Sequence, residues 1–133
     1  MIFAKYPEMR MRRNRSSDFI RQLVQETQLQ AHNLIYPIFV VDKQNCVEKI
    51  QTMPGCYRYG LEDALKKASE CYELGISAIA LFPCIESHLK SQGAHESYNP
   101  KGLIPKVIKY LKTHIPDMGI ISDIALDPYT TRS

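Results

Sequence analysis

The sequence predicts an α/β fold in which parallel strands alternate with helices. Three short apolar runs, at 34–41, 76–82 and 118–126, have the composition of buried strands. Two segments between them, at 61–74 and 103–114, repeat apolar residues with helical spacing. This βαβαβ order requires parallel strands joined by right-handed crossovers.

The connections between these elements differ in length according to what they follow. Residues 42–60 and 83–101 follow strands and form long loops, whereas only Gly75 and residues 115–117 follow helices. Long loops therefore gather at the carboxyl ends of the strands, where ligands bind in open parallel sheets and in (β/α)8 barrels. The sequence contains no glycine-rich phosphate loop, so we do not expect a nucleotide site.

Local signals support the individual elements. A helix is predicted over 18–27, with a hydroxyl N-cap from the Ser16-Ser17 pair. We expect the first strand to be buried on both faces, although Pro37 within it cannot donate to a sheet ladder. Met53-Pro54-Gly55 predicts a turn in a polar loop, and Gly75 is placed to end the helix before it.

Composition and charge favour one soluble domain with a basic extension. The chain has 133 residues, 44% of them apolar and 23% charged, which is enough for a packed core. Its net charge is +3, but residues 1–17 hold five cations and one acid. We therefore expect a basic arm at 1–17 and a folded domain at 18–133. The arm is interpreted as a solvated or subunit-docking extension, because it lacks the periodic apolar face or stacking aromatics of a membrane or nucleic-acid binder.

The sequence gives no sign of a membrane or secreted protein. No window approaches the roughly 18 apolar residues of a membrane span, and the arm lacks the apolar core of a secretory signal. The four cysteines form no Cys-x-x-Cys pair, so we predict reduced thiols at Cys46, Cys56, Cys71 and Cys84. We expect a cytoplasmic protein with no membrane or nucleic-acid partner.

Two aspartates near the end of the third apolar run are the strongest candidates for chemistry. Asp123 and Asp127 are four residues apart, so in a strand they would share a face. A carboxylate inside a buried strand is costly unless it is paired or reaches a polar cavity, which makes Asp123 a site candidate. In an alternative that stays open, Asp123 is a structural acid bound to backbone amides or Arg132, and Asp127 opens an Asp-Pro turn. The four histidines show no partnering pattern and are expected at the surface: His32, His88, His95 and His114.

Five strings, in order along 10–131, resemble the porphobilinogen synthase family, also called delta-aminolevulinic acid dehydratase. They are LIYPIFV at 34–40, MPG with YR at 53–58, ALFP at 80–83, YNP with GL at 98–103, and DIALDPYT at 123–130. The resemblance implies a TIM barrel of which this chain supplies the first three units, and an N-terminal arm that wraps a neighbouring subunit of a homo-oligomer. It also implies condensation of two 5-aminolevulinate molecules into porphobilinogen, in tetrapyrrole (haem) synthesis.

The resemblance also indicates what the chain lacks. The two Schiff-base lysines of the family lie on later strands, and no lysine in this sequence matches their positions. An enamine-type condensation needs an activated lysine amine, so the isolated chain is predicted to be inactive. The alternative function is a non-catalytic oligomerisation or interaction fragment, because an unclosed parallel sheet leaves a pairing edge.

The same resemblance assigns roles to the two aspartates. Asp123 matches an active-site acid beside the substrate-binding lysines, and Asp127 matches the metal region of the site. Zinc-dependent members carry cysteines where this sequence has Ala125 and Asp127, so the chain resembles the magnesium-type or metal-independent branch. Alanine cannot ligate, and a lone carboxylate suits a hard cation better than zinc. Mg²⁺ is therefore the metal that fits this branch, and zinc is not expected at these positions.

Overall fold

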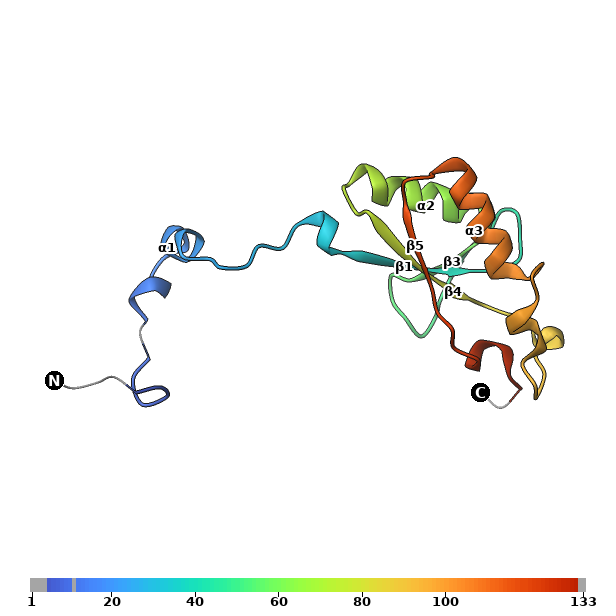
Figure 1. Cartoon of the computed structure of the whole chain (residues 1–133), viewed down its shortest axis with the longest axis horizontal. Coiled ribbons are helices and arrows are strands. Elements are labelled where there is room, and N and C mark those ends of the chain that lie inside the picture. The colour runs from blue at the N-terminus through green and yellow to red at the C-terminus, as the bar shows by residue number, and fades with distance from the viewer. Residues whose placement is uncertain (1–4, 11, 132–133) are drawn as a thin grey trace.

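The computed structural model describes residues 5–10 and 12–131, which form an extended N-terminal segment and an α/β body (Figure 1). The body starts with strand β1 (Ile35–Val40) and holds a five-stranded sheet in the order β2-β3-β1-β4-β5. Strands β4 (Ala78–Pro83) and β5 (Gly119–Ser122) lie parallel to β1 on one side of it. The predicted α/β fold with three parallel strands is confirmed.

The loop at 42–60 contains a small hairpin that the sequence reading missed. Strands β2 (Val47–Lys49) and β3 (Tyr57–Tyr59) pair antiparallel, and β3 continues the sheet parallel to β1. The predicted turn lies between them, with Gly55 at φ +82, a conformation that glycine adopts without steric cost. Three-residue strands are too short to show a period of two above the noise of a polar loop.

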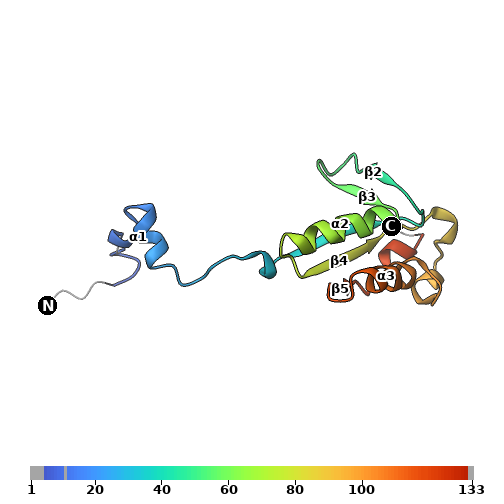
Figure 2. The same ribbon diagram turned by 90° about the horizontal axis from the view of Figure 1, so that it is seen from above.

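Two amphipathic helices cover one face of the sheet (Figures 1 and 2). Helix α2 (Leu61–Glu73) and helix α3 (Leu103–His114) form where the apolar spacing predicted them. Gly75, at φ +86, follows the end of α2 as expected for a left-handed helix terminus. The apolar stripes of the helices pack on alternate residues of β1 and β4, and the resulting core includes Ile38, Val40, Ala64, Ala68, Ile79, Leu81, Val107 and Leu111.

The opposite face of the sheet has no second layer within the described part of the chain. Ile35 is 54% exposed and Ile121 45% exposed, and Pro37, two residues after Ile35 in β1, is also exposed. Phe39 and Phe82 are paired in register on this face, with ring centroids 5.7 Å apart. The prediction that the first strand is buried on both faces is therefore wrong, because helices cover only the side that Ile38 and Val40 occupy.

The third predicted strand is shorter than expected. The sequence suggested 118–126, but β5 ends at Ser122. The Asp123 carboxylate then accepts a hydrogen bond from the Ala125 amide at 3.2 Å, a local turn that competes with the sheet ladder. A 3-10 turn, η5 (Asp127–Tyr129), follows. The inference that both aspartates share one strand face is therefore wrong.

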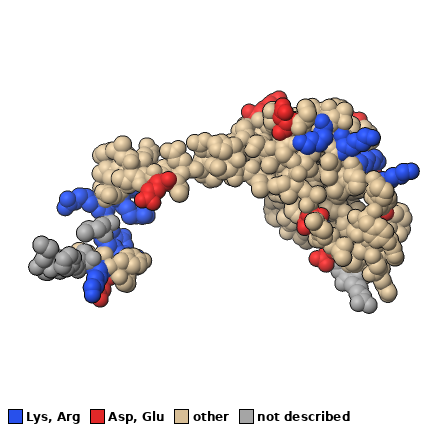
Figure 3. Space-filling view, in the orientation of Figure 1, with Lys and Arg blue, Asp and Glu red and all other residues tan. Residues whose placement is uncertain are grey.

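The extended segment includes helix α1 (Asp18–Leu23), which stops before the expected end at residue 27. Ser17 occupies the N-cap position, but its hydroxyl makes no capping hydrogen bond. Phe19 and Leu23 are 65% and 80% exposed, so no packing partner extends this short helix. Figure 3 shows Lys and Arg side chains along this segment, and the division into an arm at 1–17 and a domain at 18–133 remains a prediction.

Candidate active site

The loops that follow the parallel strands meet at one edge of the body, as the sequence predicted. Residue 42 follows β1, residue 84 follows β4, and residue 123 follows β5. Because parallel strands end at the same edge, all three loops lie together there (Figure 1). This carboxyl edge is the candidate active site.

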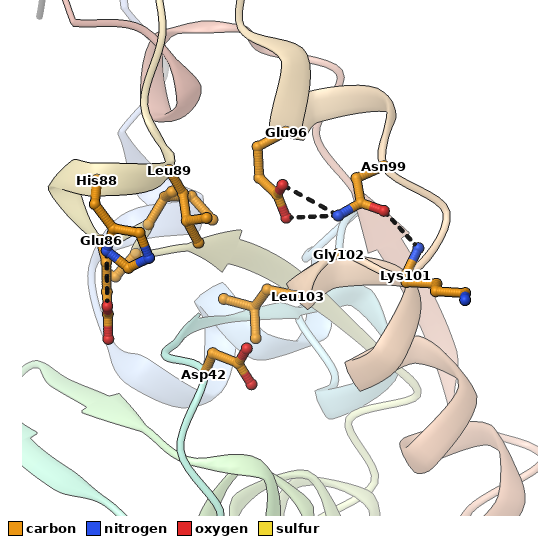
Figure 4. A pocket seen from close by; sticks show the side chains of 11 residues that line it. Asp42, Glu86, His88, Leu89, Glu96, Asn99, Lys101, Gly102 and Leu103 are labelled. Carbon is orange, nitrogen blue, oxygen red and sulfur yellow. Dashed lines mark hydrogen bonds and ion pairs between the residues drawn. The ribbon is translucent and has the colours of Figure 1, made fainter.

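A pocket of about 320 Å³ opens between the first two of these loops and the start of α3 (Figure 4). Asp42 and Glu86 stand on one side of it, and Glu96 with Asn99 stands on the other. Lys106 Nζ lies 2.6 Å from Asp42 Oδ1 and neutralises this acid locally, and His88 Nδ1 lies 3.2 Å from Glu86 Oε2. The pocket therefore has a polar lining in which Asp42 is paired with a cation.

Hydrogen bonds from residues just before α3 hold the Glu96 carboxylate. Asn99 Nδ2 donates to both Glu96 carboxylate oxygens, at 3.1 and 3.2 Å, and Asn99 Oδ1 accepts from the Lys101 amide at 3.0 Å (Figure 4). A Cβ at Gly102 would lie 2.9 Å from Glu96 Oε1 and 3.1 Å from the Asn99 carbonyl oxygen, so a side chain at this position would require the Glu96 carboxylate to shift. The YNP and GL residues at 98–103 thus form the turn that leads into α3.

Cys84 lines the same pocket and is half buried. Burial raises the pKa of its thiol, although the nearby Arg58 guanidinium acts in the opposite direction. A thiol with a raised pKa is less often ionised and is a poorer nucleophile, so we assign Cys84 no chemical role. The four histidines are exposed, which confirms the surface placement predicted for His32, His88, His95 and His114.

The two predicted site residues lie at this edge, but neither is buried. Asp123 and Asp127 are both exposed, so the argument that Asp123 is costly because it is buried is wrong. Asp123 lines a second cavity of about 430 Å³, between its own loop and the start of α3, which Glu96 also lines. Exposure leaves the Asp123 carboxylate free to accept a proton from, or balance the charge of, a group brought to this edge.

Part of the structural alternative is also present. Asp123 accepts the Ala125 amide, and Asp127 opens the η5 turn, where its carbonyl accepts the Thr130 amide at 3.3 Å. Arg132, the other partner considered for Asp123, lies outside the described residues. Within 5–10 and 12–131, no three His, Cys, Asp or Glu side chains are grouped to hold a metal ion.

Sequence reasoning missed Glu96 and Tyr129. Tyr129 is 9% exposed, and burial raises the pKa of its phenol, with the charge of Glu96 adding to the shift. Its burial was not visible in the sequence, because it follows a proline in a turn and belongs to no periodic pattern. Glu96 lies in a polar loop, where the sequence does not distinguish one site carboxylate from a solvated one.

A mostly parallel α/β sheet with polar loops at its carboxyl edge is the arrangement of an α/β enzyme. A sequence model of the delta-aminolevulinic acid dehydratase family matches residues 8–133, and the chain belongs to this family. The structure resembles that of delta-aminolevulinic acid dehydratase (porphobilinogen synthase) from Toxoplasma gondii ME49, which holds the reaction product porphobilinogen. That similarity has a TM-score of 0.85 and 46% identity, over 92% of this chain and 35% of the other.

Curated relatives agree with this assignment. A delta-aminolevulinic acid dehydratase of Bradyrhizobium diazoefficiens is 36% identical over 92% of this chain, and a chloroplastic one of Glycine max is 40% identical over the same share. The chain covers 35% and 30% of the lengths of these two relatives. It therefore spans about a third of the proteins that it matches.

Proposed function

We propose that the polypeptide to which this region belongs condenses two 5-aminolevulinate molecules into porphobilinogen, a hydro-lyase reaction of tetrapyrrole synthesis. The observation that carries the proposal is the family match over residues 8–133, together with the likeness to a structure that holds porphobilinogen. The carboxyl edge, where Asp123 stands exposed beside β5, is the part of this chain that would meet the substrate.

We further propose that β1, β4 and β5 with their helices are the first three units of a TIM barrel. The three strands are adjacent in the order in which they occur in the chain, and the helices lie on one side. The uncovered face holds Phe39, Phe82 and Ile121, which suits the packed interior of a barrel. Strand β5 lies at the edge of the sheet, where a fourth strand would pair.

Within this reaction we assign Asp123 the role of an active-site acid or base. Its exposed carboxylate at the carboxyl edge accepts a proton or stabilises an ammonium or iminium group. We propose that the isolated chain does not turn over substrate, because a Schiff base needs a lysine with a lowered pKa. Lys67 shows the reverse: its hydrogen bond to Glu70 raises its pKa.

For a metal, the described residues supply at most part of a site. Asp127 is exposed and offers one carboxylate, while Ala125 offers no ligand. If the complete site takes a metal, we propose Mg²⁺ with Asp127 as one ligand, because a carboxylate suits a hard cation and no thiolate is present at these positions for zinc. We assign no step of the reaction to this ion.

The proposal is tested with a completed protein. Residues 1–131 are joined to the remaining two thirds of the Bradyrhizobium diazoefficiens relative, and porphobilinogen is measured colorimetrically after addition of 5-aminolevulinate. We expect product from the chimaera and none from the 133-residue chain. A folded chimaera that makes no porphobilinogen would contradict the proposed function, and product from the isolated chain would contradict its predicted inactivity.

A second function is favoured by a separate observation. The extended segment exposes Phe19 and Leu23, and the sheet leaves an apolar face and an edge strand open, so the chain itself is suited to homo-oligomerisation or to pairing with a longer subunit. Analytical ultracentrifugation tests this: a stable monomer with cooperative unfolding would exclude it. None of the helices in the described residues is long and apolar enough to cross a membrane, and the cytoplasm remains our prediction for the compartment.

A further inference from the structure

A backbone hydrogen bond joins the segment of the two candidate aspartates to the loop that follows β4. The Ser91 amide donates to the Tyr129 carbonyl at 3.1 Å, and the 3-10 turn η4 (His95–Tyr98) of that loop contacts η5. The Asp123 carboxylate, by contrast, accepts the amide of Ala125 in its own segment. That local bond shapes the segment, whereas the bond from Ser91 ties it to a second loop.

Ser91 makes hydrogen bonds through both its backbone and its side chain. Its carbonyl accepts the Ala94 amide at 3.1 Å. Its hydroxyl Oγ accepts the His95 amide at 3.1 Å and lies 3.0 Å from His95 Nδ1. A hydroxyl carries one hydrogen and two lone pairs, so Oγ can make both of these bonds at once. The side chain thereby closes residues 91–95 into a turn, and the amide of the same residue holds the Tyr129 carbonyl.

This turn includes a backbone conformation that is unfavourable by itself. Ala94 is 3% exposed and has φ +50, a left-handed conformation that residues other than glycine rarely adopt. The His95 ring lies against Gly93, where an added Cβ would be 2.7 Å from His95 Cε1, and it packs edge-on to Tyr98 with ring centroids 5.9 Å apart. Such a conformation persists only where the surrounding bonds and contacts fix it. The Ser91 hydroxyl supplies two of those bonds.

The turn and the aspartate segment form two sides of one cavity. Glu96 and Tyr98 of η4 line the cavity of about 430 Å³ from one loop, and Asp123 and Ala125 line it from the other. A hydrogen bond between the two loops limits how far these sides can separate. It therefore also limits where the Asp123 carboxylate can lie, which is the kind of support that a catalytic group needs.

We propose that Ser91 is a positioning residue: its hydroxyl closes the turn at 91–95, and its amide, fixed by that turn, holds the segment of Asp123 and Asp127 at the carboxyl edge. Ser91 acts on the reaction through Asp123 and not by touching substrate. The catalytic meaning of this anchor rests on the proposed function. The anchor itself does not, because it depends on hydrogen bonds within the described chain.

The anchor is tested by hydrogen exchange, followed by nuclear magnetic resonance, on the 133-residue chain. Ser91→Ala removes the hydroxyl and keeps the backbone amide, and Ser91→Thr keeps both groups. The amide of residue 91 reports the bond to Tyr129, and the His95 amide reports the bond to the hydroxyl. The chemical shift of the Ala125 amide, which bonds to the Asp123 carboxylate, reports the position of that carboxylate.

We expect about tenfold faster exchange at residues 91 and 95 in Ser91→Ala, the size of one lost hydrogen bond, together with a displaced Ala125 resonance. Ser91→Thr should restore all three signals. The matched control is Ser87→Ala in the same loop, because Ser87 is exposed and its carbonyl, which alanine retains, accepts the Lys90 amide. This control should change none of the signals.

Amides of the core strand β4 separate a local effect from global unfolding. Faster exchange at residues 91 and 95 in Ser91→Ala, with β4 amides exchanging as in the unmodified chain and with rescue by Ser91→Thr, would confirm the anchor. Unchanged exchange at residue 91 in Ser91→Ala would overturn it. Equal acceleration in Ser91→Thr and Ser91→Ala would also overturn it, because the hydroxyl would then not be the group that holds the turn.

Kinetics of the completed protein test whether the anchor matters to the reaction. We expect Ser91→Ala to lower kcat about tenfold with little change in KM, because a displaced Asp123 impairs the chemical step more than binding, and Ser91→Thr to restore kcat. An unchanged kcat beside faster exchange at residue 91 would leave Ser91 a structural residue and overturn its positioning role. An inactive unmodified chimaera would refute the proposed function, while hydrogen exchange would still decide the anchor.

Discussion

A methyl group added at Gly60 should push the backbone of residues 43–46 away from the start of α2. Gly60 is the N-cap of α2, with φ −71 and ψ 178, which alanine adopts without strain. An added Cβ, however, would lie 2.7 Å from the Lys43 carbonyl oxygen and 2.8 Å from the Cys46 amide nitrogen. Both atoms belong to the backbone, so no side-chain rotation can relieve the overlap.

The segment that would have to move also caps the helix. The Gly60 amide donates to the Cys46 carbonyl at 2.8 Å, that of Leu61 to Lys43 at 2.9 Å, and that of Glu62 to Gln44 at 3.0 Å. Overpacking costs about 1–3 kcal/mol, and each weakened backbone bond adds about 0.5–1.5 kcal/mol. We therefore expect Gly60→Ala to lower the free energy of unfolding by roughly 3 kcal/mol.

Gly55→Ala is the matched control. Gly55 has φ +82, and a Cβ added there would meet no atom within 4 Å, so alanine at this position costs only the left-handed conformation, about 1–2 kcal/mol. Urea unfolding followed by circular dichroism measures both variants against the unmodified chain. A loss for Gly60→Ala no larger than that for Gly55→Ala would refute the steric reasoning.

Two further predictions concern packing and pH. Leu81 is 1% exposed in the core, and Leu81→Ala should lower the free energy of unfolding by about 2–5 kcal/mol. Leu74 is 73% exposed, and Leu74→Ala should change that free energy by less than about 0.5 kcal/mol. Equal losses in urea unfolding would contradict the assigned core. Hydrogen bonds from the Cys46 amide and from Lys66 lower the pKa of Asp63 below its ordinary 3.8. The stability that this carboxylate contributes is fully present above the ordinary pKa and is lost as the pH falls through the lower pKa of the folded state. Asp63→Asn should therefore flatten the acid side of a curve of unfolding free energy against pH. An acid side unchanged from that of the unmodified chain would contradict this.

The helices and the parallel core could be predicted because their signals are periodic. Leu61, Ala64 and Ala68 repeat on one face of α2, and that face is the one that the sheet buries. Gly75 was placed correctly because a left-handed helix terminus selects glycine. Such repeats are visible in the sequence because every position on a buried helix face has to be apolar.

The end of β5 and the surroundings of the site could not be predicted in the same way. An apolar run through Ile124 and Leu126 looks like strand, but a single side-chain hydrogen bond from the Ala125 amide to Asp123 ends the ladder. Glu96 and Tyr129 line the same cavity although they lie 33 positions apart in the sequence, and no periodicity connects them. Composition likewise cannot tell a strand covered on both faces from one covered on a single face, as Phe39 shows.

Kinetics of Asp123→Asn in the completed protein test the central claim most directly. The amide is nearly isosteric with the carboxylate but cannot accept a proton or balance an ammonium or iminium charge. We predict that Asp123→Asn abolishes most porphobilinogen formation with unchanged thermal stability, whereas Asp127→Asn acts mainly through the response to Mg²⁺ or hardly at all. Near-normal turnover by a stable Asp123→Asn protein would contradict the assignment of the carboxyl edge as the active site.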